Sequence, residues 1–120
     1  MKSKRISRNK NETGDMVKMG FIIIKVNYPN IKEANKAISY LLRKRLISSA
    51  NSFPIKSTSN WTGKIKEVNQ ITLLLKTRKE NWTKIKTEIK KIHPYRIPGI
   101  IKFNVESNKE YEDWVNKETN

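Results

Sequence analysis

Residues 46–77 read LISSANSFPIKSTSNWTGKIKEVNQITLLLKT, a pattern typical of two long β-strands joined by a tight turn. The first strand, Leu46–Trp61, contains Pro54. Proline cannot donate to a strand ladder, so we expect an edge strand or a strand with a bulge. Trp61-Thr62-Gly63-Lys64 supplies the turn, and Ile65–Thr77 returns as the second strand. A two-residue period predicts that Ile65, Ile71, Leu73 and Leu75 share one face.

One strand and one helix are predicted before this hairpin. Gly20–Val26 reads GFIIIKV, which is typical of a buried strand, and a turn at 27–30 ends it. Ile31–Arg45 follows as an amphipathic helix with a basic last turn. Its expected apolar face consists of Ile31, Ala34, Ile38, Leu41 and Leu42.

A second helix, a fourth strand and a terminal helix are predicted after the hairpin. Thr77-Arg78-Lys79-Glu80 has the spacing of a capping box, and Trp82, Ile85, Ile89 and Ile92 then recur at helical spacing. His93-Pro94-Tyr95 ends that helix, and Ile100–Val105 is the fourth strand. The last helix opens at Ser107–Glu110, with Tyr111, Trp114 and Val115 on one side.

This order predicts an α+β, ferredoxin-like βαββαβ fold with an extended hairpin and a C-terminal helix. Such a chain forms a four-stranded antiparallel sheet with both helices on one face, so its other face needs a cover. We expect residues 20–118 to form this domain and residues 1–19, which are basic and polar, to be a disordered tail. The true start could also be Met16 or Met19.

Composition narrows the function classes. The net charge is +15, from 26 Lys and Arg against 11 Asp and Glu. An anionic partner such as nucleic acid, anionic lipid or an acidic protein would fit this charge, but codon drift in an AT-rich genome is the favoured explanation, because the lysines are spread along the whole chain. The chain has no cysteine and one histidine, which excludes thiolate chemistry and a multi-histidine centre within one chain. Without a glycine-rich phosphate loop or a nucleophile–base motif, we predict a protein that is not an enzyme.

No membrane or secretory segment is expected. The longest apolar run, Phe21–Ile24, is far too short to span a bilayer, and residues 1–19 contain no apolar core of a signal peptide. The prediction is therefore a cytoplasmic protein, with organelle targeting by the N-terminal tail left open.

A set of motifs in a fixed order carries a family resemblance. At near-family spacing, the chain resembles the CutA family of divalent-cation-tolerance proteins over about residues 20–117. The motifs are Tyr28-Pro29, Leu46, Phe53-Pro54, Trp61-Thr62-Gly63-Lys64, Leu75-Lys76-Thr77, His93-Pro94-Tyr95-Arg96-Ile97-Pro98 and Tyr111-Glu112-Asp113-Trp114-Val115.

The resemblance implies a non-catalytic homotrimer associated with the response to divalent metal ions. In it the two hairpin strands pair with neighbouring subunits, which would satisfy their exposed edges, and the uncovered sheet faces meet at the trimer centre. It also implies a small-ligand cleft at subunit interfaces, for which the alternative is simple interface packing. The candidate cleft residues are Trp61, Lys64, Lys76, His93, Tyr95 and Trp114.

Copper binding, attributed to some relatives, has few candidate ligands here. Ser49 stands where the family usually has cysteine, Val68 and Gln70 where carboxylates are common, and Gly99 in place of a glutamate. His93 is the one weak candidate ligand, and we expect it instead to cap the preceding helix. We therefore predict no cofactor and a preference of a positively charged trimer for anions over cations.

The alternative function is a nucleic-acid-binding module, because the same element order underlies the RNA-recognition motif. That motif places aromatic residues on its first and third strands for base stacking. The predicted third strand, Ile65–Thr77, has none, which argues against this alternative.

Overall fold

The computed structural model describes residues 20–120, and the predicted tail of residues 1–19 lies outside the described residues. The elements follow the predicted order, with the terminal helix at the end of the chain. They are β1 (Phe21–Tyr28), α2 (Ile31–Arg43), β2 (Ser49–Trp61), β3 (Lys64–Thr77), the short 3₁₀ helix η1 (Lys79–Asn81), α3 (Trp82–Ile92), β4 (Ile100–Val105) and α4 (Lys109–Glu118).

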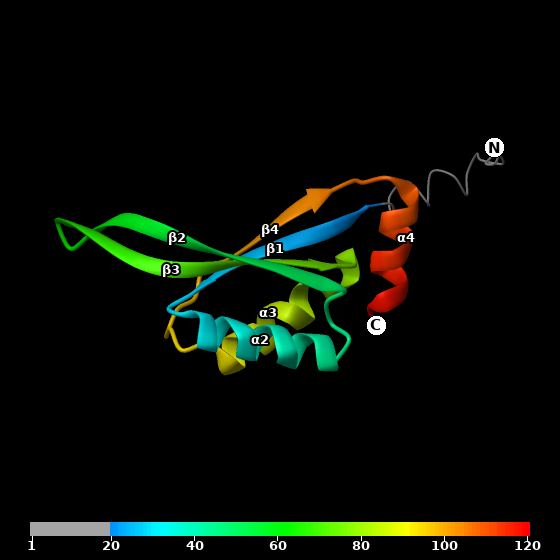
Figure 1. Ribbon diagram of the computed structural model, residues 1–120, viewed down its shortest axis with the longest axis horizontal. Coiled ribbons are helices and arrows are strands. Elements are labelled where there is room, and N and C mark those ends of the chain that lie inside the picture. Colours follow the sequence, from blue (N-terminus) through cyan, green and yellow to red (C-terminus); the bar gives the residue numbers. More distant parts are fainter. Residues whose placement is uncertain (1–19) are drawn as a thin grey trace.

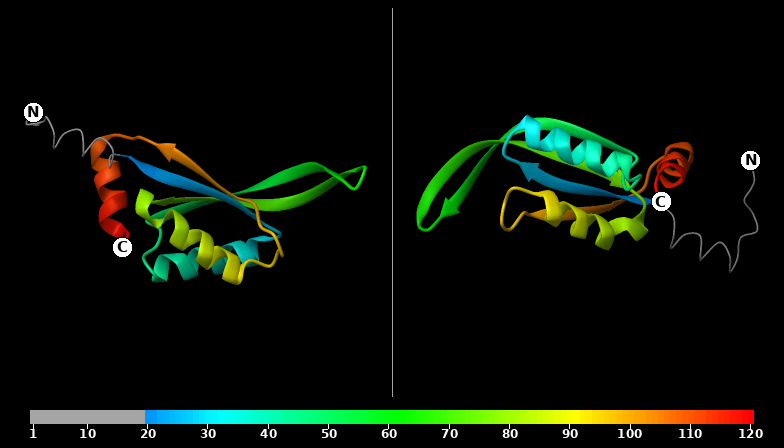
Figure 2. Two further views of the ribbon diagram at one scale, coloured as in Figure 1. Left: turned by 180° about the vertical axis from the view of Figure 1, so that it is seen from behind. Right: turned by 90° about the horizontal axis from the view of Figure 1, so that it is seen from below.

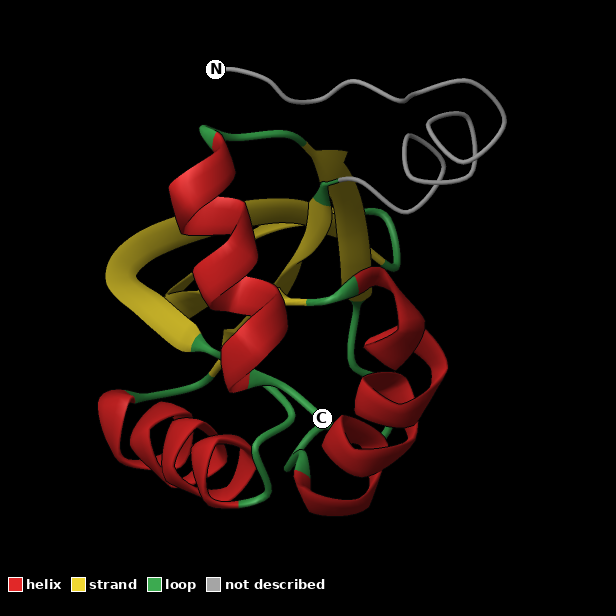
Figure 3. Cartoon of the chain, turned by 90° about the vertical axis from the view of Figure 1, so that its right-hand side faces the viewer, coloured by secondary structure: helices red, strands yellow, loops and turns green. Residues whose placement is uncertain are grey.

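The four strands form one antiparallel sheet in the order β2-β3-β1-β4, which confirms the ferredoxin-like prediction. Helices α2 and α3 lie side by side against one face of this sheet (Figures 1 and 2). Helix α4 lies across the end of the sheet, as the view with the right-hand side of Figure 1 toward the reader shows (Figure 3). Helices α2 and α3 leave the opposite sheet face uncovered, and α4 contacts that face only at its end, where Phe21 packs on Tyr111 with 5.8 Å between ring centres.

The core lies between the sheet and the two helices. Alternate residues of β1 and β3 point into it, as the two-residue period requires. Helix α2 contributes Ala34, Ala37 and Leu41, whereas Ile31 and Leu42 of the expected stripe are largely exposed. The predicted apolar face was therefore wrong at both ends. The buried face of α2 is centred on Ala37, which the prediction did not include. The remaining core side chains include Ile22, Ile24, Val26, Tyr28, Leu73, Leu75, Ile85 and Ile89.

The predicted capping box at Thr77 is wrong. Thr77 is still part of β3, and its buried hydroxyl donates to the Leu46 carbonyl at 2.6 Å and accepts from the Asn81 amide at 3.0 Å. A 3₁₀ turn separates it from α3, which begins at Trp82 without a side-chain cap. Thr77 therefore joins the start of the hairpin to the start of α3 instead of ending a helix.

Several boundaries differ from the predicted ones. Strand β1 continues to Tyr28, because Asn27 and Tyr28 still pair with β3. Strand β2 begins at Ser49, since Leu46 and Ile47 are buried in the core before the ladder starts. Helix α2 ends at Arg43, and the chain turns away at Arg45, whose φ is 57°.

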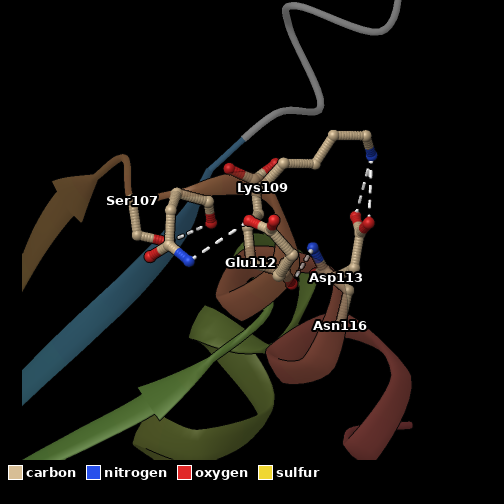
Figure 4. A network of polar contacts seen from close by, with 7 residues as sticks. Ser107, Lys109, Glu112, Asp113 and Asn116 are labelled. Atoms are coloured by element: carbon tan, nitrogen blue, oxygen red, sulfur yellow. Dashed lines mark hydrogen bonds and ion pairs between the residues drawn. The ribbon is translucent and has the colours of Figure 1, made fainter. Parts of the chain in front are cut away.

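Helix α4 is joined to the body by its C-terminal turn. The Arg78 Nε donates to the Thr119 hydroxyl at 3.1 Å, and the Asn120 backbone N–H donates to the Arg45 carbonyl at 2.9 Å. Val115 is buried, whereas Trp114 is half exposed, so the predicted apolar side of this helix is only partly inward. On its outer surface the Lys109 ammonium contacts the Asp113 carboxylate at 3.0 Å (Figure 4).

Gly20, just before β1, has no room for a side chain. Its φ is +83°, and an added Cβ would fall well inside contact distance of the Val105 carbonyl oxygen in β4. We expect Gly20→Ala to lower the free energy of unfolding by about 1–3 kcal/mol, through the positive φ and the clash. Urea unfolding at fixed protein concentration measures the change.

Gly99 provides the matched control, because a Cβ there would meet nothing within 4 Å. Gly99→Ala should change the unfolding free energy by less than about 0.5 kcal/mol. Equal effects of the two substitutions would contradict the role assigned to Gly20.

Candidate functional site

The β2–β3 hairpin extends beyond the rest of the sheet. The last pair between β1 and β3 is Tyr28 with Ile71, so residues 64–70 of β3 pair only with residues 55–61 of β2. This two-stranded ribbon is ~24 Å long at the usual rise per residue. Figure 1 shows it projecting past both helices, with no element on either edge. It has unpaired backbone groups on both sides.

The turn at the tip of the hairpin was predicted correctly. Thr62 and Gly63 both have positive φ, 50° and 85°, and join the paired residues Trp61 and Lys64. Positive φ at both central residues gives the twist that two-residue hairpins prefer. Trp61 is 63% exposed, and the Lys66 ammonium lies 6.0 Å from its ring centre. An aromatic side chain is thus held in solvent at the extreme end of the molecule.

Ile65 is the second residue of β3 after the turn, and it is 81% exposed. Its predicted partners on the same face, Leu73 and Leu75, are fully buried, and Ile71 is half-buried. The alternation of the strand is therefore as expected, but the helices end before they reach Ile65. A side chain patterned for burial has no cover within the chain.

The sheet face opposite α2 and α3, hereafter the open face, carries apolar side chains from three strands. The register places Phe53 of β2 opposite Thr72 of β3, and Ile23 of β1 opposite Phe103 of β4. Phe53 is 41% exposed and Phe103 is 47% exposed, and they lie on the two outer strands of the sheet, β2 and β4. Large apolar groups exposed across a sheet face indicate a surface that another chain covers.

His93 forms the most highly connected polar cluster in the described part of the chain. It is 8% exposed, and its ring stacks on Tyr28 with 4.2 Å between ring centres. The Tyr95 backbone N–H donates to Nδ1 at 3.0 Å, and Nε2 lies 2.8 Å from the Asn27 carbonyl. Since Nδ1 accepts, the proton is on Nε2, which donates to Asn27. His93 is the C-cap residue of α3, as predicted, and its backbone N–H donates to the Ile89 carbonyl at 2.9 Å. Its ring does not contact the last helical carbonyls and instead joins the loop after α3 to the end of β1.

Gln70 and Tyr95 extend the cluster to the hairpin. The Gln70 side-chain amide donates to the Tyr95 hydroxyl at 2.6 Å. Glutamine donates through its amide here, whereas a carboxylate at this position could only accept from the Tyr95 hydroxyl. Sequence reasoning missed the roles of Asn27, Tyr28 and Gln70. The Asn-Tyr-Pro turn signal was the one hint, and it was interpreted as the end of the strand.

Burial controls the protonation of this cluster. Desolvation lowers the pKa of His93, and the Asn27 carbonyl and the nearby Glu33 carboxylate oppose that shift only in part. Burial also raises the pKa of the Tyr28 hydroxyl, to which Glu33 adds. This hydroxyl is buried without a hydrogen-bond partner. At neutral pH both rings are uncharged, and the site is a packed, neutral junction.

The six predicted cleft residues occupy four separate places within one chain. His93 and Tyr95 lie together, with 4.8 Å between ring centres, and Trp61 and Lys64 lie together at the hairpin tip. Lys76, which contacts Asn51, is 12 residues from Lys64 along β3, or ~40 Å in an extended strand. Trp114 lies on α4 beside Tyr111. The chain alone does not form the predicted cleft.

The donor set does not fit a resident copper ion. No group of three or more His, Asp or Glu side chains that could hold a metal occurs among residues 20–120. Both nitrogens of His93 already have partners, and Glu67 on the hairpin lies 3.7 Å from the Lys56 ammonium. Histidine ligation would require breaking the Tyr95 or the Asn27 hydrogen bond. No helix in this part of the chain is long and apolar enough to cross a membrane.

Comparison with known proteins identifies the family. The family model of the CutA1 divalent ion tolerance protein matches residues 22–118. The chain belongs to the CutA1 divalent ion tolerance family. The divalent-cation tolerance protein CutA of Pyrococcus horikoshii is 37% identical over 99 residues, which cover 82% of this chain and 97% of that protein.

Solved CutA structures share the fold. CutA1 from Pyrococcus horikoshii superposes with a TM-score of 0.79 at 36% identity, covering 82% of this chain and 98% of that one. The structure described as the periplasmic divalent cation tolerance protein CutA from Archaeoglobus fulgidus has a TM-score of 0.79 at 33% identity, covering 82% and 97%. These relatives give no support to the RNA-recognition alternative.

The His93 cluster predicts a pH dependence of stability. A histidine whose folded-state pKa is lowered binds fewer protons when folded than when unfolded. Its contribution to stability is full above its ordinary pKa of 6.5 and is lost as the pH falls below that value toward the folded-state pKa. We expect wild type to lose stability between pH 7 and 5, and His93→Gln to lose less over the same range.

Urea unfolding of both proteins at one concentration measures this, because the difference between them cancels the carboxylates that titrate in the same range. At pH 8, His93→Gln should be less stable by about 1–3 kcal/mol, through the loss of the hydrogen bonds to Asn27 and Tyr95. Parallel pH profiles for the two proteins would show that His93 is not the group responsible.

Proposed function

We propose that this CutA-family chain acts in divalent-ion tolerance as a non-catalytic homotrimer with a small-ligand cleft where subunits meet. The observation that supports this most directly is the projecting hairpin, whose backbone has no partner within its own chain on either edge. Long exposed strand edges favour uncontrolled pairing unless another strand covers them. Cyclic closure of identical copies provides that cover for every copy equally.

The open face supports the same assembly. Phe53 and Phe103, with the half-buried Ile23 and Leu74, form an apolar band that crosses all four strands. Packing three such bands around one axis would remove them from water and leave α2 and α3 outside. The tip residues Trp61 and Ile65 would then lie against neighbouring subunits, which would account for large apolar side chains so far from the core.

The proposed cleft exists only in the assembly. Trp61 and Lys64 lie at the hairpin tip, while His93 and Tyr95 lie where the hairpin leaves the sheet. Only another copy can bring a tip close to a His93 cluster. We propose that Lys76 and Trp114 join the cleft in the same way, with lysines that favour an anionic ligand.

The role in divalent-ion tolerance does not require a copper ion held by one chain. The absence of cysteine and the occupied nitrogens of His93 leave no soft ligand set. A large positive charge also repels divalent cations. We propose that the protein takes part in tolerance through the assembly and an anionic ligand.

We also propose the cytoplasm as the compartment, although the Archaeoglobus fulgidus relative is described as periplasmic. Fractionation of cells that express the full chain tests this. Recovery with periplasmic marker proteins would contradict it.

Disruption of the open face should dissociate the trimer. Light scattering coupled to size exclusion should give wild type a mass about three times that of the 14.1 kDa chain. Phe53→Glu places a charge in the proposed interface and should shift the mass toward one chain. Leu42→Glu is the matched control, because Leu42 is also 41% exposed but lies on α2. A monomeric wild type, or equal effects of the two variants, would refute the assembly.

Calorimetric titration with copper should give no saturable binding in the micromolar range. The His93→Gln variant should give the same isotherm as wild type, because His93 has no free nitrogen. One equivalent of copper bound per chain by wild type and lost in the variant would show that His93 is a ligand after all.

A further inference from the structure

The outer surface of α2 and α3, hereafter the basic helix face, carries close to half of the Lys and Arg side chains of residues 20–120. Residues 31–45 and 82–92 contain nine Lys and Arg side chains against two carboxylates. All but one of these cations belong to exposed residues, and Lys86 is half-buried. Both carboxylates already have partners: Glu33 lies 3.7 Å from the Lys36 ammonium, and Glu88 lies 3.0 Å from the Lys91 ammonium. Of the remaining cations, Lys44 also interacts with the Glu88 carboxylate, and the cations outnumber the carboxylates of these segments by seven.

The charge is not spread evenly over the helices. Residues 106–118, which include α4, contain five carboxylates and two lysines. Codon drift toward lysine would make all exposed helices basic alike, yet α4 is acidic and its Lys109 is paired with Asp113 (Figure 4). Drift therefore does not explain why the cations collect on α2 and α3.

Two shallow hollows lie in the seam between α2 and α3, on either side of the hydrogen bond from Tyr40 to Glu88. The first, of about 160 Å³, is lined in part by Lys36 and Arg43. The second, of about 230 Å³, is lined in part by Lys44 and Lys84. Each hollow is thus lined by two cationic side chains and one carboxylate, Glu33 in the first and Glu88 in the second, and has a net positive charge. The helices run side by side under this seam, and the shorter of them, α3, is ~16 Å long.

We propose that the basic helix face binds the phosphate backbone of nucleic acid without sequence preference. A row of lysine and arginine side chains along a shallow groove neutralises successive phosphates and releases their counterions. This mode differs from RNA recognition on a sheet face, because it needs no stacking aromatic residue. It is independent of the proposed cleft, and the assembly would only present it three times.

An anionic membrane surface fits this face less well. Helices that lie on membranes insert large apolar side chains beneath a ring of cations. Helix α2 exposes two large apolar residues, Ile31 and Leu42, but they lie at its two ends, and the exposed residues of α3 are threonine and lysine. The face therefore lacks the continuous apolar stripe with which a helix inserts into a bilayer.

The test uses fluorescence anisotropy with the full chain and fluorescein-labelled DNA duplexes of about 20 base pairs in two unrelated sequences, over a series of salt concentrations. Wild type should bind both duplexes equally, with an affinity that falls steeply as salt rises. The double variant Arg43→Gln/Lys84→Gln removes one cation from each hollow. At about 50 mM salt it should bind about ten-fold more weakly. The slope of log affinity against log salt concentration should become smaller in magnitude by about two.

The matched control is Lys109→Gln/Lys117→Gln, which removes the same charge from α4 and should change the affinity less than about two-fold. Circular dichroism and the light-scattering mass verify that both variants keep their fold and assembly. The proposal is overturned by equal losses in both variants, by the absence of duplex binding at about 50 mM salt, or by binding to phosphatidylglycerol vesicles in preference to the duplexes.

Discussion

The structure depends on a hairpin that is longer than the sheet to which it belongs. Seven residues of β3 lie beyond the last β1 pair and form backbone pairs only with β2, so the ribbon has two unpaired edges. An isolated two-stranded ribbon is marginally stable in water. Its exposed Trp61 and Ile65 add apolar surface where no element of the chain can cover it. The open face presents the same problem at the other end of the ribbon, and three copies closed around one axis would solve both.

Periodicity predicted the elements because it reports which side chains are buried. The six residues of β4 and the face of α3 that contains Ile85 and Ile89 follow directly from it. It does not report where the covering layer ends. Ile65 has the parity of Leu73 but lies beyond the helices, and α2 buries Ala37 instead of Ile31. The Thr77 capping box failed for a related reason, since a local motif cannot show that the hydroxyl already donates to a residue 31 positions earlier.

The candidate site was predictable as a set of residues but not as a site. The sequence places His93 at the end of a helix, and a cap is the usual role there. The partner of its ring, the Asn27 carbonyl, is 66 residues away in the sequence. No local pattern in the sequence indicates that the end of β1 lies beside the end of α3. The hydrogen bond from Gln70 to Tyr95 also joins residues far apart in the sequence. The other cleft residues lie too far apart to meet in one chain, so their arrangement is a property of the assembly.

The assembly also determines where the charge goes. A chain with a net charge of +15 resists self-association unless its cations are kept apart. Exposed charges are screened beyond ~10 Å at 0.1 M salt, so repulsion between copies matters mainly for cations close to the interface. Packing through the open face puts Phe53, Ile101 and Phe103 at the contact, with Lys25 and Lys76 among the cations of that face, and leaves the basic helices on the outside. Because the copies meet through the open face, the basic helix face stays exposed and can bind an anionic partner.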